Sequence, residues 1–242
     1  MFPYVTVPPV FLGGVPIQPF ALLVSLGILV AHFVVLARAR RLGLVRAWAG
    51  EMSLAMVTVG FAGALLFKFA YRPDAVALRV FPGISSFGGI FGALAGAWLY
   101  LAAVRRVTVL PYLDVAAFAF PFGFVFGRLG CTVTHDHPGV RSDSGWLTVA
   151  YPGGARYDLG LLEMLFLVAL GAAFLVLDRR PRTPGFFVAA LLLAYGPFRV
   201  ALDHLHVDPP RYAVLSVDQW AGCALTALGL YFWQRSRKAR PL

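Results

Sequence analysis

Charged residues are scarce in this chain of 242 residues, and acidic residues are the scarcest of them. Asp, Glu, Lys and Arg together make up 13% of the sequence, whereas hydrophobic residues make up 60%. A soluble domain has about a quarter charged residues, so this composition excludes an ordinary soluble protein. The mean hydropathy of +0.76 is typical of an integral membrane protein.

Cysteine is also scarce, because the chain contains only Cys131 and Cys223. Two cysteines so far apart exclude a disulfide framework. The first residues lack the positively charged start of a cleavable signal peptide, so we expect the first hydrophobic run to be retained. No internal repeat or low-complexity segment is evident, and we expect residues 1–242 to form a single membrane-embedded domain.

Long hydrophobic runs are the main feature that is present. A membrane-spanning helix needs about 20 mostly apolar residues. Seven runs approach this length, at 18–36, 51–68, 83–103, 110–127, 159–177, 185–203 and 214–233. They predict an all-α polytopic membrane protein with about seven transmembrane helices. The third run contains several glycines, which predict close helix packing or an irregular entry: Gly83, Gly88, Gly89, Gly92 and Gly96.

The basic residues predict the orientation in the membrane. There are 21 Lys and Arg against 11 Asp and Glu, a formal net charge of +10. They cluster after the first, third and fifth runs and in the C-terminal tail, whereas residues 1–17 contain none. The positive-inside rule then puts the N-terminus outside and the C-terminus in the cytoplasm. Anionic lipid headgroups explain this charge better than nucleic acid does, so we expect no nucleic-acid partner.

A polar stretch, residues 126–139, directly follows the fourth run. It contains Arg128, Cys131, His135, Asp136 and His137, with glycines between them. Polar groups at membrane depth are costly and are kept mainly where they line a cavity or meet a charged ligand. The stretch therefore predicts the floor of an active site at the outer face. It opens the longest connection, residues 128–158, which we expect to be an outer-face loop whose aromatic residues anchor it in the headgroup zone.

Two arginines at membrane depth need anionic partners. Arg128 ends the fourth run and Arg199 lies inside the sixth. A guanidinium matches a phosphate group bidentately, which favours binding of a phospholipid headgroup. The alternative for Arg199 is a structural ion pair with Asp203. Glu163, near the start of the fifth run, predicts a buried carboxylate paired with Arg128 or Arg156, or simple electrostatics of a helix start.

The histidines allow several interpretations. An imidazole beside a carboxylate, as in His135-Asp136-His137, can be a general base or a hydrogen-bonding group, or can lie in a solvated loop. A metal site is a further interpretation, because Cys131 precedes His135 and His137, and His204 and His206 follow the sixth run. The spacing Cys-x3-His-x-His, however, is not common for zinc. We expect no metal and no cofactor. Cys131 itself is either a covalent nucleophile or a small residue under a turn.

Taken together, these residues resemble the prolipoprotein diacylglyceryl transferases. The signature of that family is Gly-Arg-x-Gly-Asn-Phe-x-Asn-x-Glu-x-x-Gly. In the same frame this chain has Gly127, Arg128, Gly130 and Gly139, with Cys131 and Thr134 at the asparagines and Asp136 at the glutamate.

Further stretches resemble the family in the same order along the chain. They are Ile17-Gln18-Pro19-Phe20, residues 83–89, Arg156 to Glu163, and Tyr195-Gly196-Pro197-Phe198-Arg199. Two departures stand out, because Phe20 replaces a tyrosine of the family and Phe87 replaces a histidine. The resemblance covers nearly the whole chain.

The resemblance implies that phosphatidylglycerol donates its diacylglyceryl group to the lipobox cysteine thiol of a prolipoprotein in the bacterial inner membrane. It implies a substrate-binding role for Arg128 and Arg199 on the lipid phosphate, supported by Glu163, Tyr195, Gly127, Gly130 and Gly139. Since Phe87 is no base, we expect His135 or His137, with Asp136, to take its place. The alternatives are a related phospholipid-dependent transferase with a different acceptor, and a non-enzymatic membrane protein that binds an anionic lipid.

Overall fold

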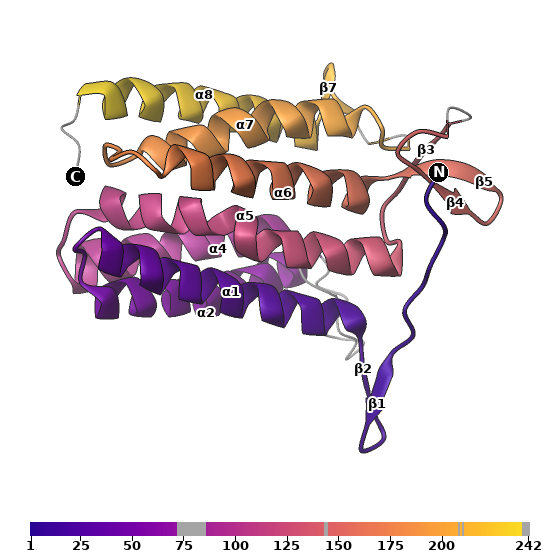
Figure 1. Ribbon diagram of the computed structural model, residues 1–242, viewed down its shortest axis with the longest axis horizontal. Coiled ribbons are helices and arrows are strands. Elements are labelled where there is room, and N and C mark those ends of the chain that lie inside the picture. Colours follow the sequence, from indigo (N-terminus) through magenta and orange to yellow (C-terminus); the bar gives the residue numbers. More distant parts are fainter. Residues whose placement is uncertain (72–85, 143–144, 208, 210, 239–242) are drawn as a thin grey trace. The chain divides into compact units, whose positions relative to one another are not determined.

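The computed structural model describes the chain except residues 72–85, 143–144, 208, 210 and 239–242. Each of the seven predicted runs overlaps a helical segment of the described residues (Figure 1). The helices are α1 (Pro19–Arg41), α2 (Arg46–Tyr71), α4 (Ser86–Trp98) with the π-helix η1 (Leu99–Val104), α5 (Val109–Thr134), α6 (Leu159–Leu177), α7 (Phe186–Asp203) and α8 (Val217–Lys238).

Five of the described helices are long and apolar enough to cross a membrane, namely α1, α2, α5, α6 and α7. The apolar helix Gly88–Val104 is shorter than the others. Helix α8 begins with an acidic residue and ends with three basic ones, Arg235, Arg237 and Lys238. The chain is therefore mostly helical and polytopic, as the hydrophobic runs predict.

The mostly helical fold is as predicted, but the connection over residues 128–158 differs from the expected loop in two respects. Helix α5 continues to Thr134, so Arg128 lies within its last turns. The rest of the connection is a three-stranded antiparallel sheet in the order β3 (Pro138–Arg141), β5 (Gly154–Asp158), β4 (Thr148–Tyr151). Residues 148–151 include β-branched and aromatic side chains that favour a strand, and Gly153, at φ +92°, allows a tight turn.

The remaining strands form two short hairpins. Strand β1 (Val10–Leu12) pairs with β2 (Val15–Ile17), and β6 (Arg211–Tyr212) pairs with β7 (Leu215–Ser216). The first residues of the chain join the larger sheet, because Phe2 exchanges backbone hydrogen bonds with Thr148 and Ala150. The N-terminal segment therefore lies against β4.

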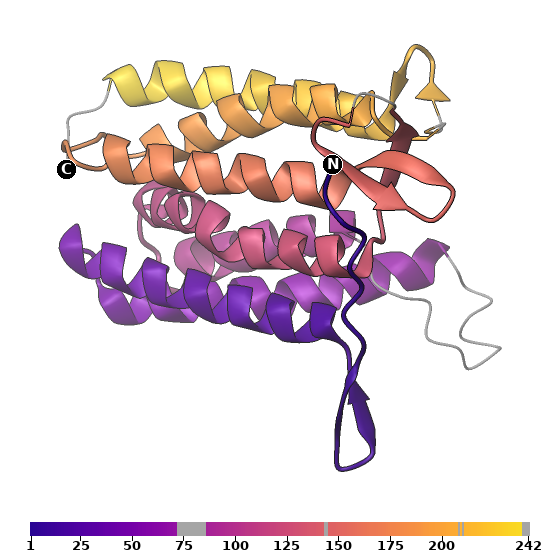
Figure 2. The same cartoon turned by 45° about the vertical axis from the view of Figure 1, so that its right-hand side comes forward.

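The chain forms two compact units, one of residues 1–31 with 117–242 and one of residues 32–116. In the first unit, α7 lies between α6 and α8 (Figures 1 and 2). Its interior contains Phe118, Phe174 and Phe187, whose rings stack or meet edge to face at centroid distances of 5.0–6.1 Å. The aromatic contacts join α5, α6 and α7.

Small residues allow α7 and α8 to pack closely. A Cβ atom added to Gly196 of α7 would lie 2.4 Å from Thr226 Oγ1 and 2.7 Å from the Gly222 carbonyl oxygen of α8. A Cβ atom on Gly222 would in turn meet the Gly196 carbonyl oxygen at 2.7 Å. Such close backbone approach is the usual packing device of membrane helices. It fixes the sequence that follows Gly196, including Arg199, against the start of α8.

The second unit uses the same device between α2 and α4. A Cβ atom on Gly92 would lie 2.4 Å from the Val59 carbonyl oxygen, and one on Gly88 would lie 2.4 Å from that of Gly63. A Cβ atom on Gly96 would lie 2.5 Å from the Ala55 carbonyl oxygen. The close packing predicted from these glycines is confirmed, although Gly83 lies outside the described residues.

Replacing Gly92 with alanine is expected to destabilise the protein more than the same change at Gly89. A Cβ atom on Gly92 has backbone at 2.4 Å, so the helices must separate, whereas the nearest atom to a Cβ on Gly89 is 3.7 Å away. Overpacking of this kind costs about 1–3 kcal/mol. Thermal unfolding midpoints of Gly92→Ala and Gly89→Ala in one detergent measure the difference, and equal midpoints would contradict the packing described here.

Candidate active site

A buried carboxylate, Glu163, connects two helices to α6. Its side chain is only 1% exposed, and its Oε2 atom lies 3.0 Å from Arg128 Nε of α5 and 3.1 Å from Arg199 Nη1 of α7. The hydroxyl of Tyr195, one turn before Arg199, donates a hydrogen bond to Oε1. One carboxyl group therefore meets side chains from both neighbouring helices.

One of the two guanidiniums, that of Arg199, also pairs with a second acid. Arg199 Nη2 lies 2.9 Å from Asp218 Oδ2, in the first turn of α8. Removing one partner of a buried ion pair costs several kcal/mol, because it leaves an uncompensated charge. Glu163, Asp218 and the two arginines together form a network of two acids and two bases at one end of the first unit. The four charges sum to zero.

The arginines remain partly open. Their side chains are 18% exposed at Arg128 and 17% at Arg199. The Arg128 guanidinium lies over the Phe124 ring at 4.9 Å, and its Nη1 is 3.9 Å from Cys131 Sγ. A guanidinium has five N–H donors, and these contacts use only part of them. The arrangement can therefore offer two forked donors to a phosphate group.

The predicted partners of these residues are partly confirmed. Glu163 pairs with Arg128, as expected, whereas Arg156 donates instead to the Gly139 carbonyl oxygen at 3.0 Å. The ion pair that was the alternative interpretation for Arg199 forms with Glu163 and Asp218, whereas Asp203 accepts a hydrogen bond from Ser216 Oγ at 2.6 Å.

Sequence reasoning missed Asp218, which is the second partner of Arg199. Helical spacing along α7 pointed to the acid one turn away, but Arg199 faces the neighbouring helix. The available signal was an acidic residue at the start of the next apolar run, where the partial positive charge of a helix start favours a carboxylate.

His135 belongs to a cluster that caps α6. Its Nδ1 lies 2.7 Å from Asp158 Oδ2, to which the Tyr151 hydroxyl also donates at 2.7 Å. The other Asp158 oxygen accepts from the Leu161 backbone N–H at 3.0 Å, which makes Asp158 the N-cap of α6. Burial and the bond to Asp158 raise the pKa of Tyr151, so its hydroxyl stays protonated and keeps donating.

The position of His135 is set by the end of α5. It has a φ of +54°, a left-handed conformation that often terminates helices, and the Asp136 N–H reaches back to the Cys131 carbonyl oxygen at 3.4 Å. The imidazole is buried and stacks on the Tyr4 ring at a centroid distance of 4.1 Å. The carboxylate that orients it is therefore Asp158, and not the adjacent Asp136.

Asp136 and His137 are exposed and lie between α5 and β3. Asp136 Oδ2 accepts a hydrogen bond from Thr134 Oγ1 at 2.7 Å. The pKa of His137 is lowered from its usual 6.5. The larger cause is partial desolvation of the imidazole, and the second is the positive charge of Arg128. His137 is thus neutral at pH 7 and able to accept a proton.

The predicted site glycines have different surroundings. A Cβ atom on Gly130 would lie 2.9 Å from the Phe20 ring, and one on Gly139 would lie 2.7 Å from the Leu205 carbonyl oxygen. These two positions need glycine for packing. Around Gly127 the nearest atom, on Phe124, is at 3.8 Å, so space remains beside Arg128.

One group in the described residues has metal-ligand geometry. The ligand atoms of Asp203, His206 and Asp218 lie within 4.8 Å of one another. All three already have partners, since Asp203 accepts from Ser216 and lies 3.4 Å from His206 Nδ1, and Asp218 pairs with Arg199. Cys131 is buried, and a Cβ atom on Gly160 would lie 3.0 Å from its Cβ, so it occupies the small space where α6 begins.

The substitution Asp158→Asn is expected to destabilise the protein, because it weakens three bonds to a fully buried carboxylate. Leaving buried polar groups poorly paired costs about 1–3 kcal/mol. Asp136→Asn is the matched control, since Asp136 is exposed and its carboxylate accepts a hydrogen bond from Thr134 Oγ1. Thermal unfolding of both variants tests this, and a lower midpoint for Asp136→Asn than for Asp158→Asn would refute the capping role.

Comparison with known proteins gives one consistent result. Residues 9–235 match the family described as prolipoprotein diacylglyceryl transferase. A phosphatidylglycerol–prolipoprotein diacylglyceryl transferase of Chromohalobacter salexigens is 29% identical over 93% of this chain and 90% of its own length. Proteins of the same name from Frankia alni (30% identical, 91% of this chain, 63% of the relative) and Streptococcus sanguinis (25%, 94% and 95%) are similar to it as well.

Proposed function

Because the chain belongs to the prolipoprotein diacylglyceryl transferase family, we propose that it transfers the diacylglyceryl group of phosphatidylglycerol to a prolipoprotein. The acceptor is the thiol of the lipobox cysteine. The observation that carries the proposal is the pairing of Arg128 and Arg199, from two helices, on the buried Glu163. This pairing holds two guanidiniums side by side, as recognition of a phosphodiester requires.

The reaction forms a carbon–sulfur bond and breaks a carbon–oxygen bond. The acceptor thiolate attacks the carbon of the diacylglyceryl group that is bonded to a phosphate oxygen, and the electron pair of the broken carbon–oxygen bond goes to that oxygen. Glycerol phosphate leaves with an additional negative charge. Donors that meet this developing charge lower the barrier, which is the role we assign to Arg128 and Arg199.

The thiol proton needs an acceptor. The family histidine is replaced by Phe87, whose side chain lies outside the described residues. We assign the role of base to His137, because it is exposed, it is neutral at pH 7, and Arg128 is close enough to lower its pKa. We assign a supporting role to Asp136, which directly precedes it in the chain. His135, which is buried against Asp158, positions the end of α5.

The remaining predictions fit this function. We propose that all seven helical segments cross the bacterial inner membrane as one domain, with the N-terminus outside and the C-terminus in the cytoplasm. The distribution of basic residues supports this orientation. The polar cluster and the sheet of residues 138–158 then lie at the outer face, where a prolipoprotein presents its cysteine. Tyr195, Gly127, Gly130 and Gly139 shape the lipid site around the two arginines.

Replacing either arginine of the pair is expected to reduce transfer about 10²–10³-fold, since each removes a donor to the leaving phosphate. The measurement uses labelled phosphatidylglycerol and a lipobox peptide with purified Arg128→Gln and Arg199→Gln. Arg141→Gln, an exposed arginine of β3, is the matched control and should keep full activity. Full transfer by both site variants would contradict the anion-binding role of the two arginines. If the unaltered chain bound the lipid but gave no transfer, a non-enzymatic lipid-binding protein would be favoured.

His137→Gln is expected to lower turnover about 100-fold or more while leaving thermal stability unchanged. Because the pKa of His137 is lowered from 6.5, the transfer rate of the unaltered protein should fall towards acid pH with a midpoint below 6.5, as the base becomes protonated. His135→Asn, which keeps a residue suited to positive φ, should instead lower the unfolding midpoint. A His137→Gln variant with normal turnover and the same acid limb would show that another group is the base.

A further inference from the structure

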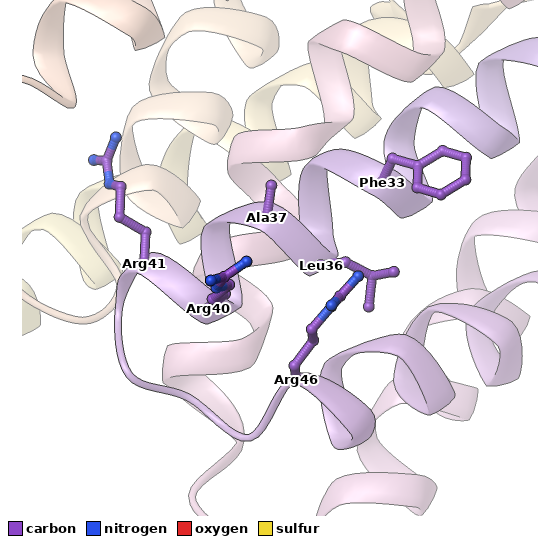
Figure 3. Close-up of a pocket in the computed structure, with 6 residues that line it drawn as sticks. All are labelled: Phe33, Leu36, Ala37, Arg40, Arg41 and Arg46. Atoms are coloured by element: carbon purple, nitrogen blue, oxygen red, sulfur yellow. The ribbon is translucent and has the colours of Figure 1, made fainter.

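A second basic site lies at the opposite end of α1 from Phe20. It is a pocket of about 670 Å³, lined by Phe33, Leu36, Ala37, Arg40, Arg41 and Arg46 (Figure 3). All six residues belong to the unit of residues 32–116. Phe20 and Arg40 are twenty residues apart, which corresponds to about 30 Å of helix and thus to the hydrocarbon thickness of a bilayer.

The lining residues divide into an apolar and a basic part. Phe33, Leu36 and Ala37 are spaced by three and four residues, so they share one face of α1. Arg40 continues this face, and Arg46, the first residue of α2, reaches back along it toward Leu36 (Figure 3). The pocket is therefore apolar towards the middle of the helix and basic at its end.

The charges in this pocket are all of one sign. Within the described part of the chain, the lining consists of three arginines and three apolar residues, with no acid. Arg40 and Arg46 are exposed, and so is Phe33, with 63% of its surface accessible. An occupant with an anionic head and an apolar body that continues along α1 would fit these residues.

We propose that this pocket binds an anionic glycerophospholipid from the leaflet at the C-terminal end of α1, separately from the donor lipid of the transfer reaction. Arg40 and Arg46 contact the phosphate, and an acyl chain lies along Phe33, Leu36 and Ala37. Basic pockets between membrane helices on the cytoplasmic side have this property, and the proposed topology puts the C-terminal end of α1 there. The volume is within the range of about 300–1,000 Å³ that is usual for ligand pockets.

The test counts lipids that remain bound to the purified full-length protein by native mass spectrometry, after incubation with dioleoyl phosphatidylglycerol or phosphatidylcholine. The unaltered chain should retain phosphatidylglycerol in preference to phosphatidylcholine. The double variant Arg40→Gln/Arg46→Gln should retain one phosphatidylglycerol fewer, whereas Arg40→Lys/Arg46→Lys should keep part of the retention. Transfer to a lipobox peptide should stay within about twofold of normal, because neither residue belongs to the Glu163 cluster.

The matched control is Arg179→Gln/Arg180→Gln, which removes two exposed arginines from the connection between α6 and α7. Its lipid retention should equal that of the unaltered protein. Unchanged lipid retention in Arg40→Gln/Arg46→Gln would overturn the proposal. An equal loss of retention in the control would overturn it too, because the retention would then depend only on the number of basic residues. If the double variant lost its thermal unfolding transition, the single variant Arg46→Gln would decide by the same criterion.

Discussion

The buried carboxylate of Glu163 is the constraint on which the candidate site depends. A charge that is 1% exposed persists in a membrane protein only if it is paired, and its partners here are Arg128 and Arg199. Each arginine would be costly alone at this depth, and together they would repel each other. The shared acid removes both difficulties while it leaves part of each guanidinium open to a phosphate. Two partly exposed guanidiniums are thus held where the donor lipid is proposed to bind, within a network whose charges sum to zero.

Two packing devices hold this carboxylate and its partners in place. The Asp158 cluster, with His135 and Tyr151, joins the end of α5 to the start of α6, and it thereby sets the distance between Arg128 and Glu163. The close approach of α7 and α8 at Gly196 sets the other side and brings Asp218 to Arg199. The residues that shape the site therefore extend well beyond those that are proposed to touch the lipid, which is typical of preorganised sites.

Much of this could be predicted from sequence, because hydrophobic runs near 20 residues and arginines at membrane depth are strong signals. The helices, the Arg128–Glu163 pair and the glycine packing were accessible in this way. The sheet of residues 138–158 was not, since its strands are short and its aromatic residues also suit an interfacial loop. Asp158 and Asp218 were missed because their partners are distant in sequence. The pairing of His135 depended on the left-handed turn after Thr134, which no local pattern indicates.

The most direct test of the account is the affinity for phosphatidylglycerol of the substitution Glu163→Gln, measured without an acceptor peptide so that no turnover occurs. Removing a negative charge beside an anionic ligand should tighten binding if the arginines hold their positions by themselves. If Glu163 is what holds both guanidiniums together, the affinity should instead fall, by about tenfold or more, which corresponds to about 1.4 kcal/mol. Equal or tighter binding by a variant that remains folded would contradict the account.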